Sequence, residues 1–110
     1  DNTKWTIELC KRLASPNFKI LYDIYHMQIS EGDIIRTITD NHQYFGHYPT
    51  AGVPGRHEMN ETQELYYPAI MKAILGTGCK GYVAQEYIPT GKTKEEKIAA
   101  LKDAVKRCDV

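Results

Sequence analysis

The chain has 110 residues, of which 42% are hydrophobic and 25% are charged, and this composition is that of a single globular domain. Fourteen Lys and Arg residues balance fourteen Asp and Glu residues. This neutrality argues against a nucleic-acid partner and against binding to an anionic membrane surface. No stretch of about 18 apolar residues occurs, so the sequence predicts no membrane span.

The cysteines predict a reducing environment. Cys10, Cys79 and Cys108 form no C-x-x-C pair, and their odd number leaves at least one thiol unpaired. Free thiols are typical of cytosolic proteins, whereas disulfide scaffolds are typical of secreted ones. We therefore expect a cytoplasmic location, with the three thiols acting as small apolar fillers.

Helical and extended patterns alternate from the start of the chain. Apolar residues recur at helical spacing from Thr3 up to the breaker SPN at residues 15–17, which predicts a first helix. Residues 18–25, FKILYDIY, are short and rich in β-branched and aromatic side chains. This stretch therefore predicts a strand.

A second helix and a second strand are predicted next. Ser30 and Asp33 resemble a capping box, and the isoleucines that follow supply a buried stripe for the helix. Residues 44–48, YFGHY, then read as a strand. A long polar loop follows this strand.

The last third of the chain repeats the alternation. Pro68 suits the first turn of a helix, which the glycines of residues 76–78 would end. Residues 81–87, GYVAQEY, predict a third strand. Thr93 and Glu96 form a capping box for a final helix, whose apolar face is Ile98, Leu101, Val105 and Cys108.

Strands alternating with helices predict an α/β fold with a parallel sheet. In such sheets ligands bind beyond the carboxyl ends of the strands. Asp23 and His26 follow the first predicted strand, Arg56 follows the second, and Glu86 follows the third. We expect these side chains to meet at one edge of the sheet. For Asp23 a structural role is the alternative, because a carboxylate at a strand end often caps the next helix or pairs with an arginine.

Three stretches together resemble the hydroxypyruvate isomerase family, within the xylose isomerase-like TIM barrels. They are YDIYHMQISEGD at 22–33, GHYPTAGVPGRHE at 46–58 and YPAIMKAILGTGCKGYVAQEYIP at 67–89. The resemblance runs from about residue 17 to residue 90. A complete barrel needs roughly 250 residues. The resemblance therefore implies that residues 1–110 are a single partial domain, the carboxyl-terminal half of a (β/α)8 barrel.

The resemblance also implies a chemistry. It implies an isomerase for a sugar or hydroxy-keto acid, in which a proton moves between adjacent carbons through an enediolate with help from a metal ion. Asp23 and Glu86 resemble ligands of Mg²⁺ or Mn²⁺, and Glu86 resembles the acid–base group as well. His26 and Arg56 resemble residues that hold substrate oxygens.

Two features depart from the family pattern and make the metal doubtful. Pro49 stands where relatives place a Gln or His ligand on the sixth strand, and its ring offers no lone pair. The glutamate of the fourth strand lies outside this chain, so at most two of four ligands are present. His47 has the parity of Pro49 but lies one layer deeper. The resemblance also implies a short seventh strand after residues 55–58.

Other functions stay open at this point. The parent protein could be a catalytically degenerate barrel retained for binding or structure, which the proline at 49 favours, or a ketose 3-epimerase. A nuclease similar to endonuclease IV is disfavoured by the neutral charge and by the lack of extra histidine ligands. A half-barrel exposes two sheet edges and an apolar face. We therefore expect a homo-oligomer, or association with the missing amino-terminal half.

Overall fold

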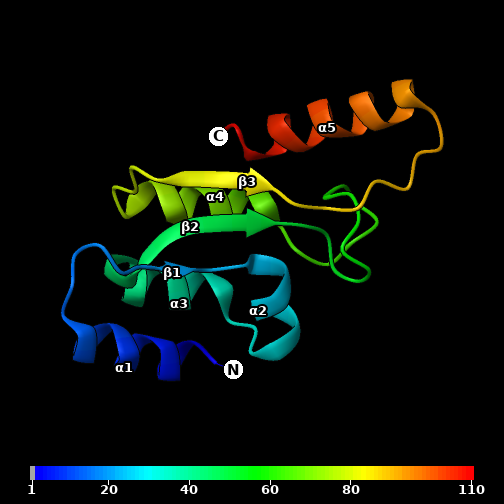
Figure 1. Cartoon of the computed structure of the whole chain (residues 1–110). Coiled ribbons are helices and arrows are strands. Elements are labelled where there is room, and N and C mark those ends of the chain that lie inside the picture. Colours follow the sequence, from blue (N-terminus) through cyan, green and yellow to red (C-terminus); the bar gives the residue numbers. More distant parts are fainter. Residues whose placement is uncertain (1) are drawn as a thin grey trace.

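The computed structural model of the chain describes residues 2–110 and shows three parallel strands alternating with helices (Figure 1). The elements are α1 (Thr3–Leu13), β1 (Ile20–Leu21), α2 (Ile24–Ser30), α3 (Ile34–Asn41), the 3-10 turn η1 (His42–Tyr44), β2 (Phe45–Thr50), α4 (Tyr67–Gly76), β3 (Tyr82–Gln85) and α5 (Lys94–Cys108). This order confirms the predicted α/β class with a parallel sheet.

The sheet has the strand order β1-β2-β3. Leu21 lies opposite His47, which in turn lies opposite Tyr82 on β3, and Pro49 lies opposite Ala84. Because β2 pairs directly with β3, the expected extra strand between them is wrong. The loop after β2 instead folds back on itself through an isolated antiparallel bridge between Gly52 and His57.

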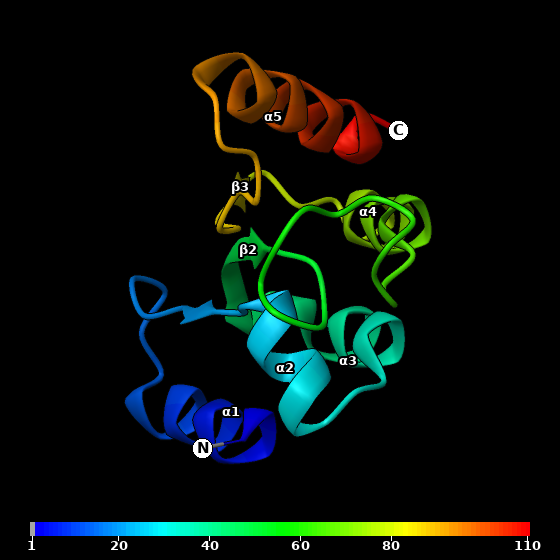
Figure 2. The same ribbon diagram turned by 90° about the vertical axis from the view of Figure 1, so that its right-hand side faces the viewer.

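The helices cover one face of the sheet. Figure 2 shows α3 and α4 on that face, with α1 beside β1 and α5 beyond β3. The core between these layers is aromatic at its centre, because Tyr22 stacks on Phe45 with ring centroids 4.4 Å apart and Tyr48 meets both rings edge-on. Isoleucines and methionines from the helices complete this core: Ile24, Ile34, Ile38, Ile70, Met71 and Ile74.

Among the described residues, the opposite face of the sheet is open to solvent at the row of Leu21, His47 and Tyr82, whereas Pro49 farther along β2 is buried. Leu21 and Tyr82, in the same register row, are 58% and 79% exposed. The predicted apolar face of α5 is also largely exposed, at Ile98, Leu101 and Val105. Parallel sheets are normally covered on both faces, so these side chains mark a surface suited to further packing.

The region after β1 differs from the prediction. The strand expected over residues 18–25 is limited to Ile20–Leu21, because Asp23 caps a helix that begins at Ile24. The expected capping box at Ser30 and Asp33 is also wrong. Asp33 precedes α3 with a left-handed φ of 52°, and its carboxylate binds Arg36 rather than a backbone N–H of the helix.

Two predicted helix starts are confirmed. Pro68 lies in the first turn of α4, and α5 begins with the complete capping box of Thr93 and Glu96. Within residues 2–110, no helix is both long enough and apolar enough to cross a membrane.

Candidate functional site

Asp23 reaches the site from the end of β1. Its Oδ1 accepts a hydrogen bond from the backbone N–H of His26 at 3.2 Å, which caps α2. Its Oδ2 lies 3.5 Å from Nη2 of Arg56 and 3.7 Å from Nε2 of His26. The structural role considered for this carboxylate is therefore present in both of its forms, because Asp23 caps a helix and pairs with an arginine.

Arg56 lies at the centre of the site, in the loop that follows β2. Its backbone has a left-handed φ of 61°, directly after Gly55 at 88°. Its Nε donates to the backbone carbonyl of Glu86 at 3.2 Å, and its Nη1 lies 3.1 Å from Nε2 of His26. The guanidinium carbon also lies 5.5 Å from the ring centroid of Tyr25, within range of a cation–π contact.

Glu86 completes the site from the end of β3. Its backbone N–H donates to the carbonyl of Thr50 at 2.9 Å, which continues the parallel pairing one residue past the strand. Its Oε2 lies 3.3 Å from Nη2 of Arg56, while 57% of the side chain stays exposed. The carboxylate is thus held on one side and accessible to a ligand on the other.

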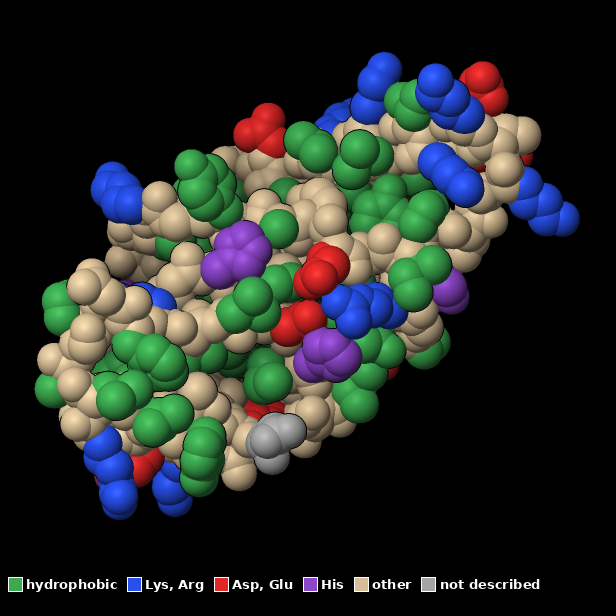
Figure 3. All heavy atoms as spheres, viewed as in Figure 1, with side chains coloured by type: hydrophobic (Ala, Val, Ile, Leu, Met, Phe, Trp, Pro, Cys, Tyr) green, Lys and Arg blue, Asp and Glu red, His purple; other side chains and the backbone are tan. Residues whose placement is uncertain are grey.

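The structure brings together all four side chains predicted for the site, namely Asp23, His26, Arg56 and Glu86. They come from the ends of three adjacent strands, as the parallel topology predicts. In Figure 3 acidic, basic and histidine side chains gather in one small area of the surface. The guanidinium offsets one of the two carboxylate charges and leaves the other for a ligand or a proton.

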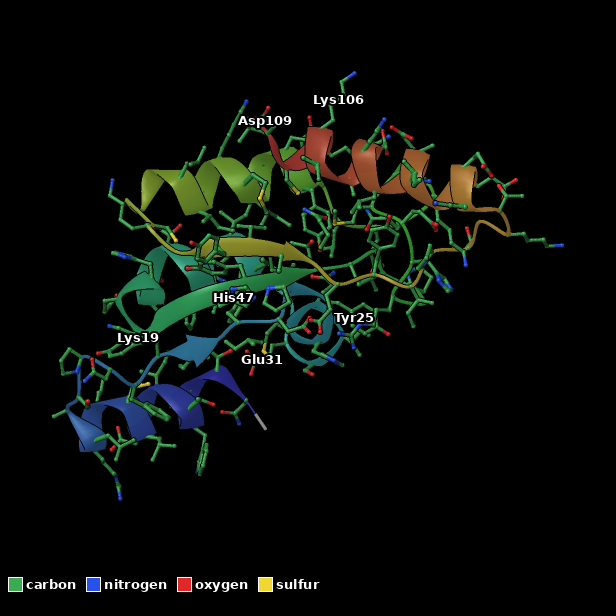
Figure 4. The ribbon with its side chains drawn as sticks, turned by 45° about the horizontal axis from the view of Figure 1, so that its top comes forward. Lys19, Tyr25, Glu31, His47, Lys106 and Asp109 are labelled. Carbon is green, nitrogen blue, oxygen red and sulfur yellow. The ribbon has the colours of Figure 1, made fainter. Side chains whose placement is uncertain are left out.

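His47 and Pro49 of β2 supply no side chain to the cluster of Asp23, His26, Arg56 and Glu86. Figure 4 shows His47 on β2 and Tyr25 near the carboxyl end of the sheet. His47 lies in the register row of Leu21 and Tyr82, before the row of Pro49 and Ala84. His47 therefore lies farther from the carboxyl ends of the strands than the cluster does, and it does not replace the side-chain ligand that Pro49 lacks.

The donor set does not fit a divalent metal by itself. Asp23 and Glu86 offer the oxygen ligands that Mg²⁺ and Mn²⁺ prefer, but Nη2 of Arg56 lies within 3.5 Å of both carboxylates. Among the described residues, no group of three or more His, Cys, Asp or Glu side chains is placed to hold an ion. Two carboxylates are too few for an all-protein site of these metals.

Sequence reasoning missed two contributors. Tyr25 was assigned to the strand, so its ring beneath Arg56 was not foreseen. The contact of Glu58 with Thr90 was not foreseen either. The Glu58 carboxylate accepts from the Thr90 N–H at 2.7 Å and from the Thr90 hydroxyl at 3.0 Å, and the separation of 32 residues along the chain hides this pairing from local sequence patterns. Asp23 three residues before His26 was the available signal for the helix that carries Tyr25, since Asp is a preferred N-cap.

A family model described as the xylose isomerase-like TIM barrel matches residues 2–108. The chain belongs to this family. It is 36% identical over 85 residues to the 2-oxo-tetronate isomerase of Cupriavidus necator, a match that covers 77% of this chain and 32% of that protein. It is also 36% identical over 92 residues to the hydroxypyruvate isomerase of Escherichia coli, covering 84% and 35%.

A solved structure agrees with this family assignment. The crystal structure of AP endonuclease, family 2, from Brucella melitensis matches 90% of this chain and 38% of its own, with a TM-score of 0.79 and 36% identity. The predicted resemblance and the TIM-barrel fold class are thereby confirmed. The chain spans about a third of the length of the curated relatives it matches.

Proposed function

We propose that the site at the carboxyl edge of the sheet isomerises a small sugar or hydroxy-keto acid. The observation that carries the proposal is the convergence of two carboxylates, a guanidinium and an imidazole at the ends of three adjacent parallel strands. The names of the two isomerases that match the chain at 36% identity support it.

The site residues suit proton transfer between adjacent carbons. The exposed carboxylate of Glu86 takes the proton from the carbon next to the carbonyl and returns it to the neighbouring carbon. The hydroxyl proton passes to the former carbonyl oxygen, so the product is an isomer of the substrate. Negative charge develops on oxygen in the enediolate, and the guanidinium of Arg56 is placed to stabilise that charge.

Arg56 and His26 also suit substrate binding. A guanidinium grips a carboxylate or a pair of oxygens through two parallel N–H bonds, which a lysine cannot do. The imidazole of His26, 3.1 Å from Nη1 of Arg56, lies beside this grip and can contact a substrate hydroxyl. Asp23 contacts both groups, with its Oδ2 facing Nη2 of Arg56 and Nε2 of His26.

A catalytically degenerate barrel that only binds a ligand is the second candidate. Pro49 favours it, because this side chain has no lone pair at a position where the resembled family carries a ligand. A ketose 3-epimerase is the remaining alternative, and it differs from the isomerase because the proton returns to the opposite face of the carbon that lost it. It therefore requires a second acid–base group across the substrate from Glu86.

Hydrogen exchange tests the proposal. The polypeptide that carries this sequence, at its natural length and with Mn²⁺ present, is incubated in heavy water with hydroxypyruvate and with ketoses. We expect deuterium to enter next to the carbonyl, as followed by NMR, and Glu86→Gln to slow this by roughly a hundredfold or more. The exposed Glu64 provides a matched control, and Glu64→Gln should leave the rate unchanged. No exchange with any substrate contradicts the isomerase and favours the degenerate barrel.

A further inference from the structure

The loop after β2 and the segment after β3 are tied together along their length. The N–H of Ile88 donates to the carbonyl of Arg56 at 2.7 Å, and Nδ1 of His57 lies 2.9 Å from the carbonyl of Ile88. Glu58 then binds Thr90 twice, from the backbone N–H to Oε1 at 2.7 Å and from the hydroxyl to Oε2 at 3.0 Å. We call these contacts of residues 56–58 with residues 88–90 the clamp.

Glu58 is the charged member of the clamp. Burial raises the pKa of the Glu58 carboxyl. The hydrogen bonds from Thr90 and the neighbouring His57 lower this pKa by more than burial raises it, so the net shift is downward. The group is therefore ionised at neutral pH, and both of its oxygens act as acceptors. Both of its oxygens are used on one residue, which fixes the spacing between the two segments.

Two glycines let the clamp close. A Cβ at Gly55 would lie 2.6 Å from the ring of His57, and one at Gly52 would lie 2.2 Å from the carbonyl oxygen of Glu58. No side chain fits at either place. The loop after β2 is thus shaped so that His57 and Glu58 approach the segment after β3.

The clamp acts on the two residues proposed for the chemistry. Arg56 has a left-handed φ of 61°, a conformation that a non-glycine residue keeps only when its surroundings hold it there. The clamp supplies this restraint at the carbonyl of Arg56 itself and at the next two residues. Glu86 begins the segment that is held on the other side.

We propose that Glu58 and Thr90 are positioning residues, which set the guanidinium of Arg56 against the carboxylate of Glu86 by locking their two loops together. The catalytic part of this inference rests on the proposed isomerase function, whereas the mechanical part does not. Glu58 lies outside the cluster and acts through Arg56, by geometry rather than by its charge.

The mechanical part is tested by the mobility of the Arg56 side chain. In the natural-length polypeptide labelled with 15N, relaxation of the Arg56 Nε–H bond gives its order parameter. We expect a rigid value of about 0.85 in the wild type and a value below about 0.6 in Glu58→Ala. Glu58→Gln keeps an acceptor for the Thr90 N–H and a donor for its hydroxyl oxygen, so we expect it to stay rigid. Glu64→Ala, in the same loop, is the matched control and should also stay rigid.

The outcomes separate the two proposals. A rigid Arg56 in Glu58→Ala overturns the clamp, whether or not the polypeptide is an isomerase. Equal loosening in Glu58→Gln and Glu58→Ala overturns the geometric role and assigns the effect to charge. Where exchange activity is present, we expect Glu58→Ala to reduce kcat/KM by roughly tenfold to a hundredfold, and Glu58→Gln to restore most of it. If Glu58→Ala does not fold, Glu58→Leu keeps a long side chain but removes both acceptors for Thr90, and an Arg56 as rigid as in the wild type then overturns the clamp.

Discussion

Tyr67 ties the helix layer to the start of the site loop, and removing its hydroxyl should be costly. Tyr67 is 1% exposed, and its hydroxyl donates to the carbonyl of Ala51 at 2.7 Å and accepts from the N–H of Ala51 at 3.0 Å. Ala51 follows β2 directly and is itself buried. One hydroxyl group thus serves both polar groups of a buried peptide residue.

The substitution Tyr67→Phe keeps the ring and removes only this hydroxyl. A buried donor or acceptor left without a partner costs about 1–3 kcal/mol, so two such groups give an expected loss of about 2–6 kcal/mol in the free energy of unfolding. No cavity larger than one oxygen atom forms, so packing adds little. A loss of this size is a large fraction of the 5–15 kcal/mol that is usual for a folded domain.

Urea denaturation of the natural-length polypeptide measures this loss, and Tyr66→Phe is the control. Tyr66 is the neighbouring residue but is 72% exposed, so its substitution should change stability by less than about 0.5 kcal/mol. Hydrogen exchange of the Ala51 amide should also accelerate in Tyr67→Phe alone. Equal midpoints and slopes for the two variants would refute the reasoning, because the hydroxyl of Tyr67 would then contribute no more than a surface group.

Three further results are expected. Burial raises the pKa of Tyr22 and of Tyr48 to about 12, so unfolded tyrosines lose protons near pH 10 while the folded ones keep them. The free energy of unfolding should therefore fall between about pH 10 and pH 12. Tyrosinate absorbance measures the loss of the tyrosine protons over the same pH range. Pro49→His should tighten Mn²⁺ binding roughly tenfold or more in calorimetry, whereas Pro89→His should not, and equal affinities would show that position 49 is not limiting. The 110-residue chain alone should sediment as a dimer or larger, because its sheet has two open edges and an uncovered face, and a compact monomer would contradict this.

The convergence of the four site residues could be predicted because it follows from topology. Once the strands are parallel, residues at their carboxyl ends lie at one edge whatever the exact length of each strand. This is why Asp23 and Glu86 were placed together correctly although β1 is much shorter than expected. The capping box at Thr93 was predictable for a related reason, since it depends only on residues three apart.

Other features could not be predicted from local sequence. The strand expected over residues 18–25 was wrong because Ile24 and Tyr25 favour strands by propensity, while the cap at Asp23 determines the outcome in the folded chain. The pairing of Glu58 with Thr90 spans 32 residues and depends on the path of two loops. Periodicity put Ile98, Leu101 and Val105 on the apolar face of α5, but these side chains are largely exposed and Ala104 is the residue of the helix that is buried, because periodicity does not show where a neighbour packs.

The two roles of Asp23 bear on how related genes should be interpreted. One oxygen caps α2 and the other faces Arg56, so selection for folding alone would preserve this residue in a lineage that had lost its chemistry, since an alanine at the N-cap costs about 1 kcal/mol. Glu86 has no such protection, because its side chain is largely exposed and its ion pair within residues 2–110 is with Arg56. After loss of activity Glu86 should drift before Asp23 does. On the proposed acid–base role of Glu86, surveys of genomes that count active members of this family should therefore use Glu86 as the marker, because counting Asp23 would include inactive descendants.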